Sequence, residues 1–147
     1  MMRFPWRLVR RISPGRAGGA GDAPHTSYET ATVVESRVVS GVNFTIAKVS
    51  FGRRVELMRR VRELARRLEF LEAGQEPGEK MDAAILRAEI DRLYVAWGVQ
   101  AVSGLVLDGA IATPESLVES GPEELFQEAL AAVRAETGLT GEQRKNS

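Results

Sequence analysis

The chain has 147 residues, which is enough for one domain with tails, and 44% of them are hydrophobic, which is enough to form a core. It carries 20 basic and 20 acidic residues, and this balance argues against a dedicated nucleic-acid-binding protein, whose affinity depends on excess positive charge. It contains no cysteine, which excludes disulfides and thiolate metal sites and is consistent with a cytoplasmic location. No apolar run is long enough to cross a bilayer.

Residues 1–27 differ in composition from the rest and are predicted to be a disordered, basic tail rich in glycine and proline. Five arginines precede the first acidic residue, Asp22. Apolar residues such as Trp6 and Ile12 leave association with an anionic membrane surface open, and an arginine-rich, acid-free start is also typical of an organelle transit peptide. A disordered tail, or a start codon assigned too early, is the preferred interpretation.

Two short runs of alternating apolar and polar residues between Val34 and Ile46 predict a β-hairpin. A two-residue loop would place Arg37 opposite Phe44 and mix the polar and apolar faces. A three-residue loop, 39–41, places Val34 opposite Ile46, and all the large apolar side chains then share one face. We expect this second register, with the apolar face packed on a helix.

The clearest pattern in the chain is an amphipathic helix predicted from about Gly52 to Ala73. Ser50 is expected to cap its N-terminus, and Gly74 is expected to end it. Its apolar residues recur at three- and four-residue steps and so form one stripe, which comprises Leu57, Met58, Val61, Leu64, Ala65, Leu68 and Leu71. Such a stripe must be buried against another part of the protein or against a partner.

A second helix is predicted from about Glu79 to Trp97, ending at Gly98. The loop before it is short, so the two helices should be antiparallel neighbours whose apolar stripes face each other and the hairpin. The stripe of this helix comprises Ala83, Leu86, Ile90, Leu93 and Trp97, widened by Met81, Ile85 and Tyr94.

The remaining third of the chain is more irregular. The turn signal Asp108-Gly109 predicts a small hairpin with Val106 opposite Ile111. Thr113-Pro114 predicts the start of a short helix ending near Ser120, and a last, longer helix should follow and end at Gly138.

The predicted fold class is α+β: an N-terminal β-hairpin, an antiparallel pair of amphipathic helices, a small second hairpin, and a short helix followed by a longer C-terminal one. Residues 28–138 are expected to form a single α+β domain, and residues 139–147 a frayed C-terminal tail.

No combination of residues predicts catalysis. His25 is the only histidine, and one histidine can neither form a metal cluster nor orient a serine triad. The glycines of the first tail lack the strand and the lysine-serine pair of a phosphate loop. Carboxylate pairs such as Glu123-Glu124 are explained by helix starts or solvated faces. We therefore expect a non-enzymatic protein with no metal and no cofactor.

The arginine-rich face of the first predicted helix is a second candidate surface. Between Arg53 and Glu72 there are seven arginines against four glutamates. Nucleic-acid binding through Arg59, Arg62 and Arg66 is one interpretation, but glutamates interrupt the basic face and no aromatic platform for bases lies beside it. A solvated face with intrahelical ion pairs is favoured, and an acidic protein partner is a third option.

From Val42 to Asn146 the chain resembles a group of small proteins encoded in phage and prophage tail-gene clusters, which are similar to the tail assembly chaperones of long-tailed phages. The segments that carry this resemblance are VNFTIAKVSFGRRVEL at Val42 to Leu57, EIDRLYVAWG at Glu89 to Gly98, GLVLDGAIATPESLVESGPEEL at Gly104 to Leu125, and the closing GLTGEQRKNS.

The resemblance implies a non-enzymatic helper in the host cell cytoplasm. Such chaperones bind the long, helical tape-measure protein, keep it soluble and help recruit tail-tube subunits, and they are absent from the finished particle; some have a second form made by frameshifting. The alternative function is that of a virion structural or connector protein. Association of the chain with itself is left open, and no membrane partner is expected. The expected partner-binding residues are Leu57, Val61, Leu64, Leu68, Tyr94 and Trp97.

Overall fold

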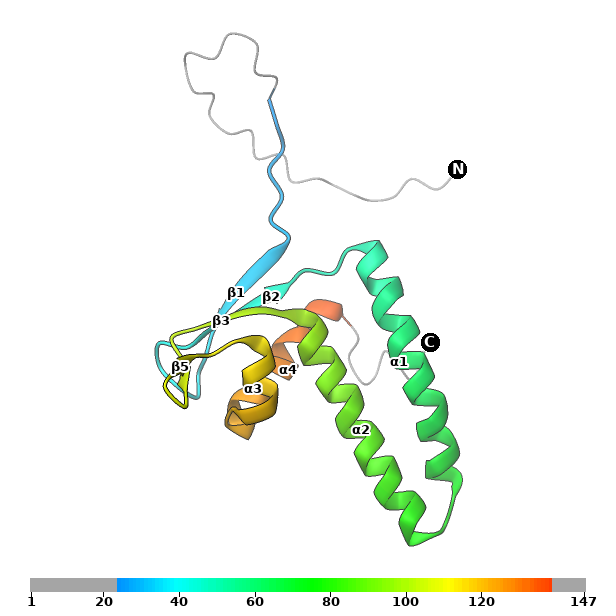
Figure 1. The fold of residues 1–147 in the computed structure, drawn as a ribbon. Helices are drawn as coiled ribbons and strands as arrows, with labels where there is room; N and C mark the ends of the chain where they lie inside the picture. The colour runs from blue at the N-terminus through cyan, green and yellow to red at the C-terminus, as the bar shows by residue number, and fades with distance from the viewer. Residues whose placement is uncertain (1–23, 139–147) are drawn as a thin grey trace, which may run out of the picture.

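The computed structural model describes residues 24–138, so the tail predicted for 139–147 and most of that predicted for 1–27 lie outside the described residues. The described part has the predicted α+β fold, with a three-stranded antiparallel sheet, a two-stranded hairpin and four helices (Figure 1). Its elements in chain order are β1 (Ala31–Glu35), β2 (Asn43–Ala47), α1 (Phe51–Ala73), α2 (Pro77–Gly98), β3 (Val99–Ser103), β4 (Val106–Leu107), β5 (Ala110–Ile111), α3 (Pro114–Ser120) and α4 (Glu123–Thr137).

The first hairpin forms, but its predicted register is wrong by two residues. Val34 lies opposite Phe44 and not opposite Ile46. The connection is a wide loop over residues 36–42, closed by a hydrogen bond of 2.8 Å from the Ser36 amide to the Val42 carbonyl oxygen, in place of a tight three-residue loop. Because a shift of two residues preserves the side-chain alternation, the apolar residues still share the predicted face.

The sheet has a third strand that the sequence analysis did not predict. β3 follows α2 without a loop and pairs with β2, so the strand order is β1-β2-β3. Its two buried residues, Val99 and Val102, are three positions apart, and the β2–β3 register shifts between Thr45 and Ile46. This irregularity removes the two-residue period by which a half-buried strand is recognised in a sequence.

The two long helices form the predicted antiparallel hairpin, which projects away from the sheet (Figure 1). The Ser50 hydroxyl accepts a hydrogen bond of 3.3 Å from the Arg53 amide, and α1 ends before Gly74, so both predicted ends of this helix are confirmed within a residue. α2 begins at Pro77, two residues earlier than predicted, because proline is well accommodated in the first helical turn. No described helix has both the length and the apolarity needed to cross a membrane.

The core lies where the sheet, the C-terminal half of α2, α3 and α4 meet. Phe44 and Ile46 from β2 pack with Leu117 of α3 and with residues of α4 such as Leu125 and Val133. The predicted second hairpin is confirmed, with Val106 opposite Ile111. α4 ends at Gly138, whose φ of 67° is the left-handed conformation expected of a helix-ending glycine.

Candidate functional site: an apolar groove along helix α1

The structure divides the six predicted partner-binding residues into two sets. Leu57, Tyr94 and Trp97 are 2%, 1% and 8% exposed and belong to the core. The other three, Val61, Leu64 and Leu68 of α1, are half-buried and pack against the edge of that core. Only this second set remains partly accessible to another molecule.

Helix α1 is covered along one side. It is 23 residues long, yet Leu57 is its one buried residue. It packs against α2, and α3 and α4 lie mostly on the other side of α2 (Figure 1). The rest of the apolar stripe is half-buried, except for Met58, which is 55% exposed.

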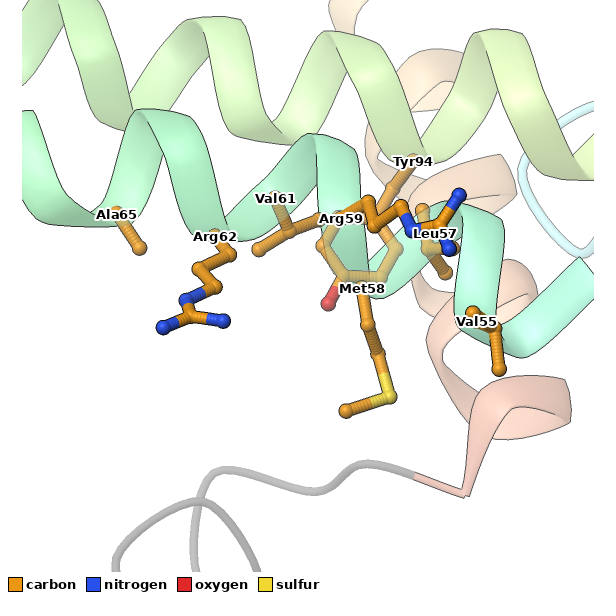
Figure 2. Close-up of a pocket in the computed structure, with 8 residues that line it drawn as sticks. All are labelled: Val55, Leu57, Met58, Arg59, Val61, Arg62, Ala65 and Tyr94. Atoms are coloured by element: carbon orange, nitrogen blue, oxygen red, sulfur yellow. The ribbon is translucent and has the colours of Figure 1, made fainter.

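Beside this stripe lies a groove of about 490 Å³, which we call the α1 groove. Figure 2 shows Met58, Arg62 and Ala65 projecting from α1, with the Tyr94 ring reaching across from α2. All the lining residues except Tyr94 come from α1, and most are apolar: Val55, Leu57, Met58, Arg59, Val61, Arg62, Ala65 and Tyr94.

The edge of the α1 groove is positively charged. Among the described residues, Arg59 and Arg62 are the only charged ones that line it. Within residues 24–138 neither has an ion pair or a side-chain hydrogen bond, and the same holds for Arg54, Arg66 and Arg67 of this helix. α1 thus presents five guanidinium groups without an ion pair in the described part of the chain.

Two arginines of α1 do have partners. Arg60 forms the i,i+4 ion pair with Glu56 at 2.8 Å, as expected for a solvated face. Arg53 donates a hydrogen bond of 2.9 Å from Nη2 to the Trp97 carbonyl oxygen and lies over the indole ring. From the sequence alone Arg53 is one more surface charge of the basic face, because only the tertiary fold brings it to the end of α2.

Several carboxylates form hydrogen bonds or ion pairs that hold elements of the fold together. Glu128 of α4 accepts hydrogen bonds from the Ser36 hydroxyl at 2.5 Å and the Arg37 amide at 2.7 Å. Asp91 pairs with Arg134, and Glu119 pairs with Arg92. In the part of the chain that the structure describes, no three histidine, aspartate or glutamate side chains gather as metal ligands would.

Three apolar groove residues, Val55, Met58 and Ala65, are not among the expected partner-binding residues, and Val55 lies outside the predicted stripe, unlike Met58 and Ala65. The latter two lie seven positions apart, at the edge of the apolar face. A wider definition of that face would have included them.

Comparisons with family models, curated proteins and solved structures found no match to this chain. A function is therefore inferred from the α1 groove and its charge.

Proposed function

We propose that this protein is a non-enzymatic, tail assembly chaperone-like protein whose α1 groove holds a helix of a phage tape-measure protein. The observation that carries the proposal is the partial burial of α1, which leaves a half-buried apolar stripe, an exposed Met58 and a groove of about 490 Å³ beside them. A soluble protein seldom leaves such a surface unless it serves an interaction.

The shape of the groove favours a helical partner. Its lining residues extend along α1 from Val55 to Ala65, a distance of about 15 Å at 1.5 Å per residue. A helix lying alongside would place apolar side chains in the groove at three- and four-residue intervals over about three turns. An apolar stripe of that kind is what a largely helical client supplies.

The charge at the groove edge favours an acidic client. Arg59 and Arg62 have no partner within the described chain, so carboxylates flanking the apolar stripe of a client helix would compensate them. A second copy of this chain in the same groove would bring arginines together. The charges of both signs elsewhere on the surface favour solubility while an apolar client is held.

Co-expression with a tape-measure protein of the same genome tests the proposal. The wild-type protein should raise the soluble fraction of the tape-measure protein, and Met58→Glu should abolish that gain because it places a carboxylate in the apolar groove. Ile111→Glu is the matched control, since Ile111 is 78% exposed and lies on β5, away from α1. An unchanged soluble yield with the wild-type protein contradicts the proposal.

Mass spectrometry of purified particles separates this proposal from a structural role in the virion. A chaperone should be missing from finished particles. Stoichiometric presence of this chain in them would instead assign it to the connector class.

A further inference from the structure

A second apolar surface lies near the tip of the α1–α2 hairpin and shares no residue with the α1 groove. It contains a hollow of about 530 Å³ lined by Arg66, Arg67, Phe70, Leu71, Asp82, Ile85 and Leu86, which we call the tip surface. Phe70 is 77% exposed and Ile85 is 55% exposed. Met81, one turn before Ile85 on α2, is 67% exposed and extends the apolar area.

The charges of the tip surface are divided between its two helices. Both basic side chains, Arg66 and Arg67, come from α1, and the carboxylate, Asp82, comes from α2. None of the three has an ion-pair partner among the described residues. The tip surface therefore carries its basic side chains on α1 and its carboxylate on α2.

We propose that the tip surface is a two-fold interface between two copies of this chain. In a two-fold contact the same surface meets itself, so it must be complementary to itself. With the two-fold axis parallel to the two helices, α1 of one copy lies over α2 of the other, and Arg67 faces the second copy's Asp82. With the axis across the helices, α1 meets α1 and the arginines face each other, which like-charge repulsion disfavours.

This arrangement brings the tips of the two hairpins together, with two helices from each copy. The tip surface spans residues 66–71 of α1 and 81–86 of α2, so it is about 9 Å long at 1.5 Å per residue and about 20 Å wide, or roughly 200 Å². That area is well below the roughly 800 Å² per partner of a standard stable interface, so the dimer is a weak one. The dimer should therefore form reversibly with rising protein concentration.

Sedimentation equilibrium over a range of protein concentrations tests the proposal. The wild-type chain should reach twice the mass of one chain, and Ile85→Glu should remain a monomer, with circular dichroism showing an intact fold. Ile111→Glu should dimerise like the wild type, because it alters an equally apolar side chain outside the tip surface. A wild-type chain that stays monomeric at every concentration overturns the proposal.

A charge exchange tests the direction of the axis. Arg67→Asp and Asp82→Arg should each weaken the dimer, and the double variant should restore it, because each pair across the axis is then reversed. Failure of the double variant to restore association, with its helix content intact, contradicts the parallel axis.

Cysteine cross-linking tests independently which residues face each other in the dimer, since the natural chain has no cysteine that would interfere. Arg67→Cys mixed with Asp82→Cys should form a disulfide between chains, whereas Arg67→Cys alone should not. Cross-linking of Arg67→Cys to itself alone would overturn the arrangement. The dimer is independent of the proposed client: Met58→Glu should lose client binding and keep the dimer.

Discussion

Arg53 at the start of α1 lies over the indole of Trp97 at the end of α2, with its guanidinium carbon 4.7 Å from the ring centroid. The same guanidinium donates a hydrogen bond to the Trp97 carbonyl oxygen at 2.9 Å. This contact ties the base of α1 to the core, while the rest of the helix extends along α2. The position of the α1 groove therefore depends on it.

Replacing Arg53 with alanine should loosen the base of α1. Arg53→Ala is expected to lower the free energy of unfolding by about 2 kcal/mol, because it removes both a cation–π contact and a hydrogen bond to a partly buried carbonyl. Urea denaturation measures this change. Arg54→Ala, at an exposed neighbour without an ion pair, should stay within about 0.5 kcal/mol of wild type, and an equal loss in both variants would show that the stacking has no energetic role.

The wide loop of the first hairpin should depend on a carboxylate more than 90 residues away in the sequence. Glu128→Ala is expected to destabilise the protein by about 2 kcal/mol, because it removes the acceptor for the buried Ser36 hydroxyl and the Arg37 amide. A double-mutant cycle with Ser36→Ala should give a coupling energy of about 1 kcal/mol. Additive effects of the two substitutions would contradict a direct interaction, and Gln127→Ala serves as an exposed control on the same helix.

The same contact explains why the hairpin register could not be predicted from the sequence. Alternation between Val34 and Ile46 gives the buried face, because parity is a local property. The pairing itself depends on Ser36 turning toward Glu128, a residue of α4, instead of continuing the strand. β3 was missed for a related reason, since its period is broken by a register shift in its partner strand.

Helix ends, in contrast, were predicted within about two residues, because capping is local. Thr113 accepts a hydrogen bond from the Ser116 amide and begins α3 where proline follows, as predicted. The candidate site was predictable only in part, unlike the helix ends, which were predicted, and β3, which was not. The stripe of α1 was predictable from its period, but the burial of Leu57 and the exposure of Met58 depend on which side α2 covers.

Two glycines with similar backbone angles should respond differently to alanine. Gly104 and Gly109 have φ values of 77° and 80°, so both substitutions carry left-handed strain of about 1 kcal/mol. A Cβ atom at Gly104 would also lie 2.0 Å from the Gly41 carbonyl oxygen, whereas at Gly109 it would meet nothing within 4 Å. Gly104→Ala should therefore lower the free energy of unfolding by at least about 3 kcal/mol and Gly109→Ala by about 1 kcal/mol. Similar midpoints of thermal unfolding for the two variants would contradict the close approach of the two loops.

Charge reversal at the edge of the α1 groove should weaken client binding without changing the fold. Arg62→Glu is expected to reduce the affinity for a tape-measure fragment by about tenfold, since it replaces attraction to the client's carboxylates with repulsion. Raising the salt concentration should weaken wild-type binding for the same reason. Isothermal titration calorimetry with a purified fragment measures both effects.

The matched control for this experiment is Arg54→Glu, which makes the same change of charge on α1 at a position that does not line the groove. It should leave client affinity within about twofold of wild type, because exposed charges outside a contact contribute little. An equal loss in Arg54→Glu and Arg62→Glu would show that the whole basic face attracts the client. Retention on DNA that falls equally in both variants would favour a polyanion as the partner of that face, since phosphate binding depends on summed positive charge and not on one groove.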